Sequence, residues 1–316
     1  MQQMAAYNQT HGPSYQGWQM VYDRLSIAVL VLALSLALPT AAAWLYLLHR
    51  HHRLASKARF LFLLVTTLSQ LVYFSSSLVR FSLHFIGKPV ARILCALLLT
   101  LQNYAIALEL GALAFMCLDR YVAICQPLTY ESVFSLENIW KVLMLMFLLP
   151  LFLQLVLVLL QLFGAGGNPV AYVVCTNDCL DHSAWLTYTR VGLTISHLLP
   201  NMTIIVVSYV LVVREGVRSG AISPANRRAQ STLAYHLLQM ALFLLPMVNY
   251  TFLSPLQRRG IIGEDVMTFG RIVAIMCFTA GQVISPIIHG LRSEEICSLL
   301  LRSLGKRRRV AAVQDL

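Results

Sequence analysis

The chain has 316 residues, of which 58% are hydrophobic and only 12% charged, and its mean hydropathy is +0.69. A soluble domain is usually about 45–50% apolar and about 25% charged, so this composition excludes soluble, disordered and coiled-coil proteins. The net charge of +11 does not indicate a nucleic-acid surface, because the basic residues lie between apolar segments, where they direct membrane topology.

Seven segments are apolar enough and long enough to cross a bilayer, whose hydrocarbon core takes about 20 helical residues. In chain order they are 25–48, 60–79, 93–118, 142–163, 191–213, 232–253 and 272–291. The sequence shows no internal repeat and no separate soluble domain. We therefore predict an all-α, seven-helix membrane bundle at 25–291, flanked by an outer segment at 1–24 and an inner tail at 292–316.

The distribution of Lys and Arg predicts the orientation. Placing the N-terminus outside puts 16 of the 24 basic residues in segments that face the cytoplasm and 8 elsewhere. The positive-inside rule therefore favours an outer N-terminus and an inner C-terminus. The same orientation exposes Asn8, which begins an Asn-Gln-Thr glycosylation sequon, outside the membrane.

The third segment ends in the string MCLDRYVAICQPL, residues 116–128, which resembles the signature of the odorant receptors within the rhodopsin-like G-protein-coupled receptors. Further matches are Ser208-Tyr209, the string RRAQSTLAYH at 227–236, Phe243, Pro246, and SPIIHGLRSEEI at 285–296. Departures from that family's pattern include Ser285 and His289 in place of Asn and Tyr, and the lack of an acidic residue in the second segment. These departures are typical of a divergent member, and we assign it to a fish-type branch.

The resemblance implies a receptor in the plasma membrane of olfactory cilia. An odorant would bind between the outer helix halves and activate a heterotrimeric G protein of the stimulatory olfactory type, raising cyclic AMP. The implied switch residues are Asp119, Arg120, Tyr121, Tyr209, His236, Ser285, Pro286 and His289. The candidate pocket residues are Gln102, Asn103, Ile106, Leu244 and Arg271. Because an arginine always stays charged, we expect Asp119 to hold Arg120 at rest and to release it on activation; the alternative is an ion pair that only anchors the helix.

Glu109 lies ten residues before Asp119, about 15 Å deeper along the helix. An acid at that depth is costly and usually functional. The resemblance implies a sodium ion beside it. A structural role, protonated or hydrogen-bonded to groups such as Ser285, is the alternative.

The cysteines and the C-terminal segment predict a disulfide and an amphipathic helix. By resemblance, Cys95 forms a disulfide with the second outer loop, where the sequence does not choose between Cys175 and Cys179. Residues 293–304 carry apolar side chains at helical spacing followed by a basic run, which predicts an amphipathic helix on inner-leaflet lipid.

Three further residues and the overall function each have an alternative interpretation. Arg271 either attracts an anionic ligand or extends to the membrane interface. His236 and His289 are expected to form hydrogen bonds rather than a metal site, and no nucleophile–base set predicts an enzyme. A receptor for a peptide or lipid, a receptor that signals poorly, and a small transporter or channel are the alternatives to an odorant receptor.

Overall fold

The computed structural model describes residues 13–51, 57–163, 170–176, 184–219, 238, 241–242, 256 and 260–292. In this part of the chain, six helices are long and apolar enough to cross a membrane. They are α2 (Pro13–Arg50), α4 (Ala58–Ile86), α5 (Arg92–Cys125), α7 (Leu136–Phe163), α8 (Ala184–Arg218) and α11 (Glu264–Arg292). They match six of the seven predicted spans. The predicted sixth span lies outside the described residues except for Leu238, Ala241 and Leu242.

Each of the six helices extends beyond the apolar segment that predicted it. The helices that begin furthest before their predicted starts are α2, which begins at Pro13, α11, which begins at Glu264, and α8, which begins at Ala184. At about 1.5 Å per residue, the 34 residues of α5 reach about 51 Å, well beyond a hydrocarbon core of about 30 Å. Hydropathy therefore marks only the part of each helix inside the hydrocarbon.

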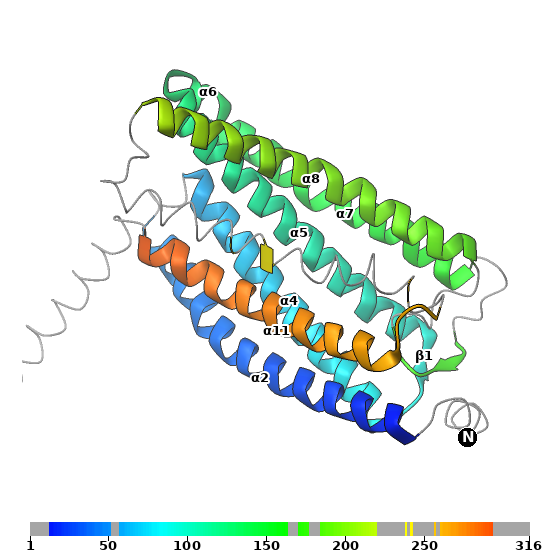
Figure 1. Ribbon diagram of the computed structural model, residues 1–316. Coiled ribbons are helices and arrows are strands. Elements are labelled where there is room, and N and C mark those ends of the chain that lie inside the picture. Colours follow the sequence, from blue (N-terminus) through cyan, green and yellow to red (C-terminus); the bar gives the residue numbers. More distant parts are fainter. Residues whose placement is uncertain are drawn as a thin grey trace, which may run out of the picture.

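Helix α5 runs through the middle of the described bundle (Figure 1). It packs against α4, α7 and α8, while α2 packs against α4 and α11. Buried side chains from five helices meet in one core, among them Phe62, Leu113, Ile139, Ile205 and Phe278. Residues on α5 are therefore placed to contact most of the other helices.

Two glycines allow helices to approach closely. A Cβ atom on Gly111 would lie 3.0 Å from Met146 Cγ of α7, and one on Gly281 would lie 3.0 Å from Leu242 Cβ. Small residues commonly permit such contacts between membrane helices. The second contact places Leu242, from the predicted sixth span, directly against α11.

The two ends of the bundle are built differently. At one end, α4 stops at Gly87, whose positive φ of 68° suits glycine, and the short strands β1 (Val90–Ala91) and β2 (Tyr172–Val173) pair antiparallel. At the other end, α5 is followed by η1 (Pro127–Thr129) and α6 (Tyr130–Val133). Following the predicted orientation, we call the strand end outer and the α6 end inner. The predicted sequon at Asn8 and the amphipathic helix at 293–304 lie outside the described residues.

Candidate functional site

The inner end of α5 holds a nearly buried carboxylate. Asp119 is 5% exposed, and its Oδ1 accepts a hydrogen bond from the Tyr130 hydroxyl of α6 at 2.7 Å. The guanidinium groups of Arg59 and Arg120 lie within electrostatic reach of the same carboxylate. Asp119 is thus held by a phenol and by positive charge from two helices, α4 and α5.

The chain reversal after α5 positions Tyr130. Pro127 begins η1, where a missing backbone N–H is tolerated, and the chain then turns back into α6. The Tyr130 ring lies 5.4 Å from that of Phe134, centroid to centroid. Burial, and then the hydrogen bond to Asp119, raise the pKa of Tyr130, so its hydroxyl remains a neutral donor at physiological pH. Sequence reasoning missed this residue, although it lies only eleven positions after Asp119.

The other predicted switch residues fall at several places. Tyr121 accepts a hydrogen bond from Gln126 Nε2 at 3.3 Å, and Tyr209 packs against the main core from α8. Ser285 is buried in α11 at 2% exposure. Pro286 and His289 lie in α11 beyond the described side chains, and His236 lies outside the described residues.

Glu109 lies at the middle of α5 and is 1% exposed. One carboxylate oxygen accepts a hydrogen bond from Gln70 Nε2 of α4 at 2.9 Å, and the other accepts one from Gln282 Nε2 of α11. Ser285, the suggested partner, lies three residues beyond Gln282 on α11. The carboxylate therefore joins three helices through two buried glutamines, neither of which the sequence analysis identified.

The groups around Glu109 also fit a hard cation. Gln282 Oε1 is buried and has no hydrogen-bond partner in the described part of the chain. Amide rotation would present carbonyl oxygens of Gln70 and Gln282 beside the carboxylate. Hard cations prefer such oxygen ligands. These three side chains are the ones that would hold the sodium ion implied by the resemblance.

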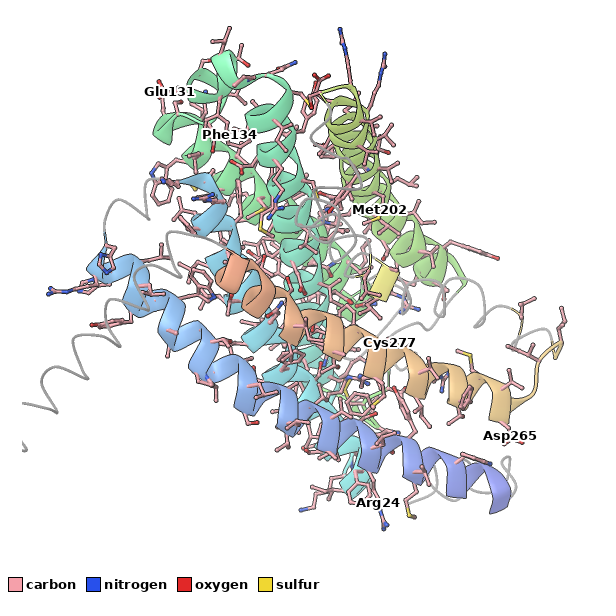
Figure 2. All side chains as sticks on the ribbon, turned by 60° about the vertical axis from the view of Figure 1, so that its left-hand side comes forward. Arg24, Glu131, Phe134, Met202, Asp265 and Cys277 are labelled. Carbon is pink, nitrogen blue, oxygen red and sulfur yellow. A yellow bond between two sulfur atoms is a disulfide. The ribbon has the colours of Figure 1, made fainter. Side chains whose placement is uncertain are left out.

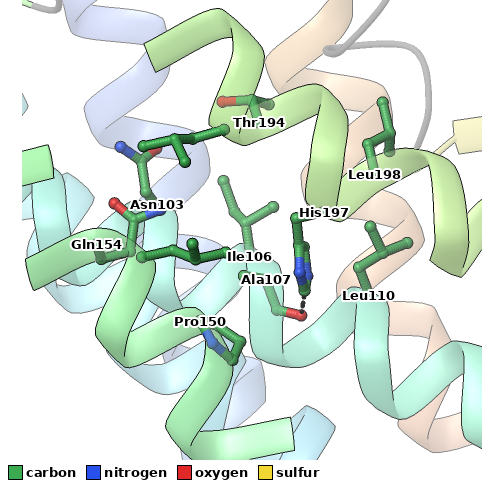
Figure 3. A pocket seen from close by; sticks show the side chains of 11 residues that line it. Asn103, Ile106, Ala107, Leu110, Pro150, Gln154, Thr194, His197 and Leu198 are labelled. Carbon is green, nitrogen blue, oxygen red and sulfur yellow. Dashed lines mark hydrogen bonds between the residues drawn. The ribbon is translucent and has the colours of Figure 1, made fainter. Parts of the chain in front are cut away.

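A pocket of about 60 Å³ lies between α5, α7 and α8 (Figure 3). We call it the lateral pocket, and it is lined by Asn103, Ile106, Ala107, Leu110, Pro150, Leu153, Gln154, Leu193, Thr194, His197 and Leu198. The lining is mostly apolar and includes no Asp, Glu, Lys or Arg. It therefore suits a small uncharged molecule with few polar groups.

Some polar groups of the lateral pocket form hydrogen bonds within the protein, and one does not. His197 Nε2 lies 3.2 Å from the Ala107 carbonyl oxygen, and Thr194 Oγ1 donates to the Arg190 carbonyl at 2.9 Å. Gln154 Oε1 is buried and has no hydrogen-bond partner among the described residues. This oxygen is an acceptor that a bound hydroxyl group could satisfy.

Two of the predicted pocket residues, Asn103 and Ile106, line the lateral pocket, whereas Gln102 and Arg271 do not. Gln102 is buried elsewhere on α5, and its Nε2 has no partner within the described residues. Leu244 lies outside the described residues. Gln154 and His197 were not singled out as ligand contacts, because a polar residue in an apolar span does not show which face it occupies.

The outer end is closed by a disulfide between Cys95 of α5 and Cys175, with a Cα–Cα distance of 5.4 Å. Next to it, the Arg92 backbone N–H donates to the Ala171 carbonyl at 2.8 Å. The structure therefore pairs Cys95 with Cys175; Cys179 lies outside the described residues.

Six membrane-length helices with α5 at their centre, and part of a further predicted span against α11, have the architecture of a seven-helix membrane bundle. The chain belongs to the rhodopsin family of 7 transmembrane receptors, because the model of that family matches residues 27–289, a range that includes the predicted sixth span. Proteins of this family are signalling receptors and not enzymes.

Similarity to individual proteins confirms the resemblance to olfactory receptors. Human (Homo sapiens) olfactory receptor 8K1 is 25% identical over 208 residues, covering 63% of this chain and 62% of the relative. Human olfactory receptor 9Q2 is 25% identical over 229 residues, with 70% of each chain covered. The chicken (Gallus gallus) olfactory receptor-like protein COR4 is 26% identical over 197 residues, covering 60% of this chain and 61% of the relative. The fish-type branch stays a prediction.

Proposed function

We propose that this protein is a chemosensory receptor whose ligand is a small, uncharged organic molecule bound in the lateral pocket. The observation that supports this proposal most strongly is the lining of that pocket, which is mostly apolar and contains no Asp, Glu, Lys or Arg. The olfactory names of the relatives support the same ligand class. The buried acceptor Gln154 Oε1 favours a ligand with a hydroxyl group, because a bound hydroxyl would remove an unsatisfied polar atom.

The signal would pass along α5, which contributes to the lateral pocket and carries Asp119 and Arg120 at its inner end. A ligand shifts the receptor toward its active state only if it binds that state more tightly. We assign the G-protein contact to Arg120 and to Leu128, which lies in η1 at the inner end and is 98% exposed. The partner would be a heterotrimeric G protein of the stimulatory olfactory type, and the site of action the plasma membrane of sensory cilia.

For Glu109 we propose that a sodium ion occupies the oxygen set of Glu109, Gln70 and Gln282 in the resting receptor. The test compares the thermal unfolding of the purified receptor in sodium chloride and in choline chloride. Sodium is expected to raise the unfolding temperature of the wild-type chain but not of Glu109→Gln. Equal unfolding temperatures in the two salts would leave Glu109 with its hydrogen-bonding role alone.

The ligand proposal is tested by measuring cyclic AMP in cells that display the chain at their surface. The panel contains matched aliphatic alcohols, ketones and alkanes. Alcohols are expected to be the most potent, and Gln154→Leu is expected to weaken them about tenfold while leaving ketones little changed. A receptor that is displayed at the surface yet answers none of these compounds would contradict the proposal.

A further inference from the structure

A second polar cluster lies away from the lateral pocket, at the outer ends of α2, α4 and α11. Figure 2 shows Arg24 of α2 and Asp265 of α11 near this end of the bundle. The side chains of interest are Tyr22 on α2, Arg80 on α4 and Arg271 on α11. All three are partly buried.

Arg80 is held inside the bundle with an unused donor. Its Cζ lies 4.3 Å from the centroid of the Phe81 ring, and the Tyr22 ring packs edge-on against Phe81 at 5.6 Å. Arg80 Nε is buried and has no hydrogen-bond partner in the described part of the chain. The guanidinium and Tyr22 thus lie close to the same aromatic ring.

Arg271 approaches the same place from α11. It follows Met267 and Thr268, both 2% exposed, by one helical turn, so it lies on the face of α11 that points into the bundle. Both Arg80 and Arg271 lie within electrostatic reach of the Tyr22 hydroxyl. Two positive charges therefore converge on one neutral phenol.

One described carboxylate, that of Asp23, also lies within electrostatic reach of the Tyr22 hydroxyl. The ion pairs found among the described residues, His84–Asp23 and Lys141–Glu137, include neither Arg80 nor Arg271. The Asp23 carboxylate forms its ion pair with His84, whose Nδ1 lies 2.9 Å from Asp23 Oδ2, so it does not pair directly with either arginine. Because arginine cannot lose its charge, the two guanidinium groups and the unsatisfied Nε–H of Arg80 favour binding of an anion at this partly buried place.

We propose that Tyr22, Arg80 and Arg271 form a binding site for the carboxylate of a small organic acid. A guanidinium matches the two oxygens of a carboxylate, and the Tyr22 hydroxyl supplies one more donor. The Phe81 and Tyr22 rings, which lie beside the Arg80 guanidinium, would contact the apolar part of such an acid. The site is distinct from the lateral pocket and does not depend on the receptor's coupling to a G protein.

The test measures binding of sodium benzoate to the purified full-length receptor in lipid nanodiscs, with benzamide as the uncharged analogue and the ionic strength held constant. Benzoate is expected to bind saturably, and its affinity is expected to fall about tenfold or more in Arg80→Gln and in Arg271→Gln. Arg24→Gln is the matched control, because Arg24 is exposed at the same end of α2. This control should bind benzoate like the wild-type chain.

Equal affinity for benzamide, or full benzoate affinity in both arginine variants, overturns the proposal. Gln154→Leu separates the two sites: a loss of benzoate binding in this variant, with none in the arginine variants, would place the acid in the lateral pocket. Gel filtration and the unfolding temperature establish that each variant is folded. If Arg80→Gln does not fold, Arg271→Gln and Tyr22→Phe decide the matter, since each removes only one donor group near the outer end.

Discussion

Glu109 and Asp119 are two nearly buried carboxylates on the same helix, but they are held in different ways. Glu109 receives neutral amide donors from Gln70 and Gln282, which belong to two other long helices. Asp119 receives its phenolic donor from Tyr130, only eleven residues along the chain, and is attracted by two arginines. The first arrangement spans the bundle, whereas the second is partly local to the inner end.

From this difference we infer that the contacts of Glu109 stabilise the bundle, whereas those of Asp119 regulate activation. Moving α4 or α11 away from Glu109 would leave a buried carboxylate without donors, which costs several kcal/mol. The contact of Asp119 with Tyr130 can open through a small change in the α5–α6 turn, at the boundary with water. We therefore expect substitutions around Glu109 to change stability and substitutions around Asp119 to change signalling.

Arg120→Ala has the largest expected effect. Because Arg120 is assigned to the G protein, its loss should abolish ligand-dependent cyclic AMP while surface display stays near the wild-type level. Lys141→Ala removes a basic residue at the same end, in a solvent-exposed pair with Glu137, and serves as the control. Normal signalling by Arg120→Ala would remove the assigned role of the inner end.

The second largest effect is expected from Glu109→Ala, which should lower the stability of the receptor. It leaves the amides of Gln70 and Gln282 unsatisfied in the centre of the bundle, and we expect a loss of about 3 kcal/mol in the free energy of unfolding. Glu109→Gln keeps an acceptor and should lose less. Thermal unfolding in detergent measures both, with the exposed Asp265→Asn as control. If Glu109→Ala unfolds at the wild-type temperature, the contrast with Asp119 is wrong.

Tyr130→Phe tests the other carboxylate. It removes one hydrogen bond to Asp119 and keeps the ring that packs on Phe134. A hydrogen bond to a charged group contributes about 1.5–3 kcal/mol, so the resting state should weaken and basal cyclic AMP should rise about tenfold. Tyr188→Phe, at a side chain that is 76% exposed, should leave the basal level unchanged. An unaltered basal level in Tyr130→Phe would show that this hydroxyl does not restrain activation.

The smallest effects are expected from alanine at the two interhelical glycines, and the larger of these is expected for Gly281→Ala, next to Gln282. The new methyl group would meet Leu242 Cβ, which is fixed to its backbone, so we expect a loss of about 1 kcal/mol. Gly111→Ala should cost less, because it meets the flexible Met146 side chain at the same 3.0 Å distance. Unfolding temperatures in the reverse order would show that α11 moves more easily here than α7.

The sequence alone was sufficient to place six of the described helices, because the cost of exposing polar backbone to hydrocarbon makes long apolar segments helical. It also identified Cys95, Glu109 and Asp119 as sites of interest. The true ends of the helices were missed, since α2 and α8 continue into more polar sequence that hydropathy does not mark.

The glutamine partners of Glu109 could not be predicted from the sequence, for a different reason. Gln70 and Gln282 are 39 and 173 residues away from Glu109, and nothing local relates them. Their meeting depends on how α4 and α11 rotate about their axes, which is decided by packing across the whole bundle. The lateral pocket was missed in part for the same reason, because Gln154 and His197 become neighbours only when α7 and α8 pack beside α5.

The disulfide also has a consequence for the chain between α7 and α8. Twenty residues, 164–183, connect Phe163 to Ala184, and Cys175 divides them into stretches of eleven and eight residues on either side of it. Nine residue steps lead from Cys175 to Ala184, which at about 3.4 Å each reach at most about 31 Å. With the 5.4 Å between the Cα atoms of the disulfide, the start of α8 stays within about 36 Å of Cys95 in α5. The covalent bond thereby sets an upper limit on how far the outer ends of these two helices can separate, whichever state the receptor adopts.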